Sequence, residues 1–136
     1  MSIFFPDNWA NLRYPNIRSD LLLFLEELSD VEYQSNYVIS SNTAHDKFDI
    51  DEIYHFFFDD TDLVINAEGC IGQILFDIDE VKLVSEVTEI LKKILEDLGD
   101  SGNDEYTSHP YWRNVVDKAS LALRKLSEAG TPLITQ

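Results

Sequence analysis

Several residue types that fix the class of a protein are scarce in this sequence. It holds one cysteine, Cys70, which cannot form an internal disulfide, and this fits a reducing compartment. No apolar run approaches the length of about 20 residues that a membrane-spanning helix needs. The first residues also lack the basic and then apolar pattern of a secretory signal. We therefore expect a cytoplasmic protein with no membrane segment.

Basic residues are also scarce, and this limits the kinds of partner. The chain has 10 Lys and Arg against 26 Asp and Glu, a formal net charge of −16. We do not expect the protein to bind nucleic acid directly, because phosphate contacts need Lys and Arg. Residues 46–105 hold eighteen acidic residues and four lysines, an excess of fourteen negative charges. Such a concentration costs stability through self-repulsion, so a cationic partner that is attracted to it is a natural explanation.

The remaining composition is that of a folded domain. Hydrophobic residues make up 44% of the 136 residues, with 8 Phe, 6 Tyr and 2 Trp, whereas acidic disordered segments lack aromatics. This length suits one hydrophobic core. We therefore predict a single domain over residues 1–136. In it, residues 1–14 form an ordered N-terminal arm and residues 129–136 form a C-terminal tail.

Three segments have the periodicity of amphipathic helices. Pro15 can begin a helix over residues 15–29, in which leucines recur at helical spacing. A second helix begins after Asp77, an expected N-cap, and ends at Gly99. A third is predicted over residues 108–128, with inward apolar positions from Trp112 onward.

Other segments favour strands. Residues 50–58 are dense in aromatic and β-branched side chains and predict a central strand buried on both faces. A second strand is expected near the end of residues 30–41, and residues 71–76 are a short apolar segment. The predicted fold class is therefore α+β: a helix-dominated single domain with three main helices and a small sheet of two or three strands.

One short sequence occurs twice, as Phe48-Asp-Ile-Asp-Glu-Ile53 and Phe76-Asp-Ile-Asp-Glu-Val81. Because a strand is expected after the first copy and a helix after the second, we interpret the pair as coincidence. The second copy also resembles the nucleophile motif of haloacid-dehalogenase-type phosphatases. That resemblance would make Asp77 and Asp79 a magnesium-dependent phosphotransferase site. The downstream lysine and acidic pair of that family are missing, so a helix cap is the preferred interpretation and no catalytic residue is predicted.

Metal and cofactor sites are not expected either. The acids after residue 58 lack the glycine and glutamate of a calcium loop, and the three histidines have no ligand spacing. His55 is interpreted as a core histidine, and Cys70 as a small buried hydrophobe. No glycine-rich phosphate loop is present.

Three phrases together resemble a known family. They are Leu12-Arg-Tyr-Pro15 before a leucine-rich helix, His55-Phe-Phe-Phe-Asp-Asp-Thr61, and Glu105-Tyr-x-x-His-Pro-x-Trp-x-x-Val-Val116. In this order they resemble small acidic bacterial immunity proteins of the contact-dependent growth inhibition and polymorphic toxin type. The resemblance implies a partner, the C-terminal domain of a cognate toxin, and no catalytic motif.

Charge and resemblance together predict a function. We expect an immunity protein that binds and neutralises a cationic toxin domain, a nuclease acting on RNA or tRNA, by electrostatic and steric blockade. The alternative is an acidic adaptor or regulatory domain with an unrelated basic partner. The predicted contact face consists of Asp46, Asp49, Asp51, Glu52, Asp59, Asp60 and Asp62.

Overall fold

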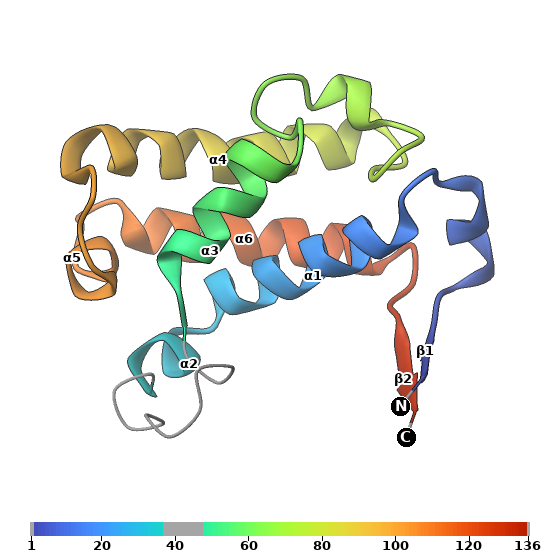
Figure 1. Ribbon diagram of the computed structural model, residues 1–136, viewed down its shortest axis with the longest axis horizontal. Coiled ribbons are helices and arrows are strands. Elements are labelled where there is room, and N and C mark those ends of the chain that lie inside the picture. Colours follow the sequence, from blue (N-terminus) through green and yellow to red (C-terminus); the bar gives the residue numbers. More distant parts are fainter. Residues whose placement is uncertain (1, 37–47, 136) are drawn as a thin grey trace.

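Three long helices form the body of the computed structural model, which describes residues 2–36 and 48–135. They are α1 (Pro15–Ser29), α4 (Ile78–Leu98) and α6 (Trp112–Ser127). Helix α6 packs against both α1 and α4 and runs antiparallel to each (Figure 1). The three predicted helices are thus confirmed. Pro15 occupies the first turn of α1, Asp77 caps α4, and Gly99 ends α4 with a positive φ of 57°.

Short elements connect and flank these helices. Two 3-10 segments, η1 (Asp7–Asn11) and η4 (Glu68–Cys70), lie before α1 and before α4. Helix α2 (Val31–Asn36) follows α1, and α5 (Asn103–Thr107) joins α4 to α6. Helix α3 (Ile50–Tyr54) continues into a π-helical turn, η3 (His55–Asp60). Figure 1 shows α3 crossing the long helices.

The predicted α+β class is wrong, because the domain is all-α. Within the described residues, strands are limited to β1 (Ser2–Phe4) and β2 (Leu133–Thr135), which pair antiparallel with Phe4 opposite Leu133. This pairing joins the segments predicted as arm and tail, and no strand belongs to the core. The strand expected near residue 39 lies outside the described residues.

The central strand predicted over residues 50–58 is also wrong, since this segment is α3 and η3. Asp49 caps the helix, and its Oδ1 accepts hydrogen bonds from the backbone N–H groups of Asp51 at 3.0 Å and Glu52 at 3.5 Å. Buried residues recur at helical spacing, at positions 50, 53, 54 and 57, while residues 51, 52, 55 and 59 are exposed. The hydrogen bonds of a π-helical turn span five residues in place of four, and both Phe56 and Phe57 are buried in it.

The two copies of the repeated sequence therefore have the same local role. Asp49 caps α3, and Asp77 caps α4 by accepting a hydrogen bond from the Glu80 N–H at 3.0 Å. The copies differ in their glutamate. Glu52 is exposed, whereas Glu80 is buried. The interpretation that a strand follows the first copy is wrong, because the Asp cap signal acts in the same way in both.

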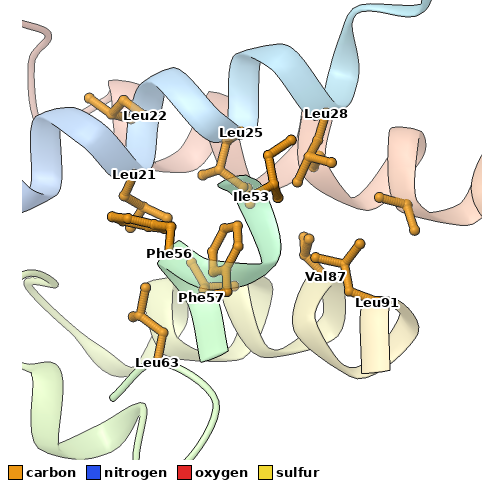
Figure 2. Packing of buried hydrophobic residues seen from close by; sticks show 14 of the residues in the cluster. Leu21, Leu22, Leu25, Leu28, Ile53, Phe56, Phe57, Leu63, Val87 and Leu91 are labelled. Atoms are coloured by element: carbon orange, nitrogen blue, oxygen red, sulfur yellow. The ribbon is translucent and has the colours of Figure 1, made fainter. Parts of the chain in front are cut away.

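The core lies where α1, α3, η3, α4 and α6 meet. Figure 2 shows Ile53 and Phe57 pointing toward leucines of α1 and toward Val87 and Leu91 of α4. Ile53, Phe57, Val87 and Leu91 are all fully buried. The short α3–η3 segment therefore closes the core between the two longer helices, with its opposite face left to solvent.

Candidate partner-binding groove

A surface groove of about 590 Å³ runs between α1 and the α3–η3 segment. We call it the acidic groove. Its lining residues come from both walls: Asp20, Leu23, Phe24, Asp49, Asp51, Glu52, His55, Phe56 and Asp60. Five of these nine are carboxylates, and no Lys or Arg is among the described residues that line it.

The α3 wall owes its charge to the helical pattern of its sequence. Burial of Ile50 and Ile53 turns Asp51 and Glu52 to the exposed side. Both acids also lie in the first turn of α3, where the helix dipole stabilises negative charge. Asp49 remains exposed while it caps the helix. The folding signals of α3 therefore place three carboxylates along one edge of the groove.

The α1 wall is joined to this edge by aromatic packing. Phe24 of α1 and Phe56 of η3 lie with ring centroids 4.8 Å apart, and Phe56 is buried. This contact holds the two walls together beneath the carboxylates. Asp20 and Leu23 stand on the α1 side, and Leu23 is 51% exposed. The groove thus combines an acidic rim with an apolar base.

Two acids of α1 have raised pKa values in this setting. Desolvation raises the pKa of Asp20. Desolvation, together with the negative charges of Glu52 and Glu26, raises the pKa of Glu27 to about 7. Glu52 belongs to the α3 wall, so the carboxylate of this wall repels that of Glu27, which lies on α1 beside the groove. A cationic group placed between them would remove this repulsion.

The structure brings four of the seven predicted contact residues together. Asp49, Asp51, Glu52 and Asp60 line the acidic groove. Asp59 and Asp62 do not line it. Asp59 lies one residue before Asp60 and pairs with His55 at 2.7 Å, whereas Asp62 lines a neighbouring hollow of about 410 Å³ with Asp60. Asp46 lies outside the described residues.

The interpretation of His55 as a core histidine is wrong, because its side chain is 68% exposed.

Sequence reasoning missed the α1 wall. Asp20 and Leu23 of this wall lie at i and i+3, and Glu27, which lies beside the groove, follows at i+7, so the three share one helix face. The buried leucines of α1 occupy the opposite face. Leu23 could have indicated this face from the sequence. It follows two leucines of the buried face, but the helical spacing of the buried leucines places it on the exposed side.

A second hollow lies on the other side of α1. It has a volume of about 440 Å³, and we call it the apolar groove. Its lining consists of Ser19, Asp20, Leu22, Leu23, Glu26, Leu123, Ser127, Thr131 and Pro132. Leu22, Leu123 and Pro132 make it more apolar than the acidic groove. Asp20 and Leu23 line both grooves, so they form the ridge between them.

The other residues that could carry chemistry have structural roles within the described part of the chain. Asp77 is the cap of α4, as preferred from the sequence. Cys70 is buried, as predicted, and burial raises its pKa. His109 accepts from the Tyr111 N–H through Nδ1 at 3.0 Å and reaches Asp97 through Nε2 at 2.9 Å. Residues 2–36 and 48–135 contain no cluster of His, Cys, Asp and Glu suited to a metal ion.

Comparison with known proteins places the chain in a family. Residues 12–131 match the model of a domain of unknown function, DUF7945, and the chain belongs to that family. No curated protein and no solved structure matches the chain. Among the described helices, none is both long enough and apolar enough to span a membrane.

Proposed function

We propose that this protein is a cytoplasmic immunity protein that binds and neutralises the cationic C-terminal domain of a cognate toxin. The acidic groove carries this proposal. Its five carboxylates come from two elements, and no Lys or Arg is among the described residues that line it to balance them. Next to the groove on α1, the pKa of Glu27 is raised chiefly by desolvation and then by the negative charges of Glu52 and Glu26. A basic partner gains from this arrangement because it relieves the repulsion as it binds.

A nuclease is the toxin class that suits this surface best. Nucleases hold a polyanionic substrate through Lys and Arg, and the same residues are attracted to the acidic groove. The protein then acts by electrostatic and steric blockade, without catalysis. Electrostatic steering also raises association rates, toward 10⁸–10⁹ M⁻¹s⁻¹ at low salt, which suits an inhibitor that must bind before substrate is cleaved.

The test is co-expression with the toxin domain encoded next to this chain. We expect growth to be restored, and the purified complex to loosen as salt rises, because screening weakens the attraction between exposed charges. Absence of rescue and of binding would overturn the proposal for that pair. Binding without neutralisation, or binding to a basic partner that is not a toxin, would support the adaptor alternative instead.

A further inference from the structure

The ridge of α1 continues beyond the two grooves. Leu23 also borders a third hollow of about 310 Å³, which Glu26, Glu27, Asp30 and Tyr33 complete. Asp20, Leu23 and Glu27 therefore follow one another along the outer face of α1, and Asp30 comes directly after its last residue. Residues 20–29 are the last ten residues of α1 and span about 15 Å, so acids flank an exposed leucine over roughly three turns. We call this line of four residues the α1 stripe.

The apolar side of the stripe needs a cover that the described chain does not provide. Leu23 is 51% exposed in the middle of a helix, between three hollows. Leu22 is buried and Leu123 partly buried, and both open onto the apolar groove beside Leu23. In protein interfaces, most of the binding energy comes from a few apolar anchors that are buried at the centre and surrounded by polar groups. Leu23, with carboxylates around it, has the position of such an anchor.

We propose that the α1 stripe docks a basic amphipathic helix of the toxin domain. Its apolar side chains cover Leu23 and enter the apolar groove, and its Lys and Arg face the acidic groove. This inference rests on the proposed function and names the kind of toxin segment that is bound.

Charge and spacing select this occupant. The hollows on both sides of Leu23 carry carboxylates, so an acidic or neutral apolar segment would desolvate them without compensation. A basic segment pairs with them. The stripe is linear and follows helical spacing, and a partner helix lying along it presents side chains at matching i, i+3 and i+7 positions.

The experiment uses two probes and two variants. One probe is the toxin domain encoded next to this chain. The other is an 18-residue Lys/Leu peptide designed as an amphipathic helix, compared with a scrambled isomer of identical composition. Leu23→Gln removes the anchor, and Leu121→Gln is the control, because Leu121 is also a partly exposed leucine within a long helix (42%) and lines none of the grooves described above. Circular dichroism checks that both variants keep the helical content of the wild type.

We expect the wild type to bind the amphipathic peptide at least tenfold more tightly than the scrambled isomer. Leu23→Gln should abolish this preference and weaken toxin binding at least tenfold, and Leu121→Gln should change neither. Equal binding of both peptides, or equal effects of the two variants, would overturn the inference. If the toxin binds in a salt-dependent manner but is indifferent to Leu23→Gln, the proposed function stands and this docking mode fails. If the toxin does not bind at all, the proposed function fails as well.

Discussion

Arg18 and Glu80 form a buried, two-pronged ion pair that links the three long helices. Arg18 Nη1 and Nη2 each donate to a Glu80 carboxylate oxygen at 2.8 Å, and both side chains are almost fully buried. The guanidinium also donates to the backbone carbonyls of Ile74 and Leu126, at 3.0 and 3.1 Å. Glu80 Oε1 accepts a further hydrogen bond from the Phe76 N–H at 2.8 Å. One pair thus connects α1, α4, the end of α6 and the segment before α4.

Breaking this pair should be strongly destabilising. Removing one partner of a buried ion pair strands the other charge, which costs about 3–5 kcal/mol. We expect Arg18→Met to lower the free energy of unfolding by about this amount in urea denaturation. Adding Glu80→Gln should recover at least ~1 kcal/mol, because the stranded charge is then removed. If the double variant lost as much free energy of unfolding as Arg18→Met and Glu80→Gln lose separately when added together, the two residues would not act as a pair.

The equivalent roles of Asp49 and Asp77 can be compared directly. Replacing a helix N-cap by Ala costs about 0.5–2 kcal/mol, whereas Asn caps nearly as well as Asp. We therefore expect Asp49→Ala and Asp77→Ala to be destabilising in urea denaturation, and Asp49→Asn and Asp77→Asn to have little effect. If Asp49→Ala had no effect while Asp77→Ala did, the first copy of the repeated sequence would not be a helix start in solution.

Glu27 should make stability depend on pH. Its pKa is raised from 4.5 to about 7, chiefly by desolvation and then by the negative charges of Glu52 and Glu26. Between these two values the native state retains a proton that the unfolded chain releases. The stabilising contribution is therefore complete below pH 4.5 and is lost as pH rises toward about 7.

The variant that tests this is Glu27→Gln, which cannot ionise. Its urea midpoint should exceed that of the wild type at pH 8 and approach it at pH 5. Glu89→Gln is the control, because Glu89 is an exposed glutamate on α4, outside the grooves. Equal pH profiles for Glu27→Gln and Glu89→Gln would contradict the assignment to Glu27.

Cys70 should react slowly with thiol reagents. Its side chain is 1% exposed, and burial followed by the negative charge of Asp62 raises its pKa, which disfavours the reactive thiolate. We expect labelling by a disulfide reagent at pH 8 to be slow in the native state and rapid in urea. Fast labelling of the native protein would mean that the segment around residue 70 opens readily.

The long helices could be predicted from sequence, and the charged groove only in part. Apolar periodicity, Pro15, Asp77 and Gly99 are local signals, and they gave the bounds of α1 and α4 correctly. The α3–η3 segment was misassigned because its aromatic and β-branched residues favour strands, and one extra residue in the π-helical turn obscures the helical period.

The prediction of the contact face was incomplete because residues 50–58 were assigned to a strand. Asp51 and Glu52 were expected beside a strand, whereas they line a groove whose other wall is α1. Asp20 and Leu23 lie about thirty residues earlier in the chain, and only tertiary packing brings them to this edge. The partner of Arg18, 62 residues away, was equally invisible to local pattern.

The most direct test of the account compares the affinity of the purified toxin domain for three proteins at physiological salt. They are the wild type, Asp20→Asn/Glu52→Gln, and the control Glu89→Gln/Glu96→Gln. Both variants lose two negative charges, but only the first loses them from the acidic groove. We predict that the groove variant binds at least tenfold more weakly, about 1.4 kcal/mol, and that the control binds like the wild type. Equal affinities for the two variants would contradict the claim that the acidic groove is the toxin-binding surface.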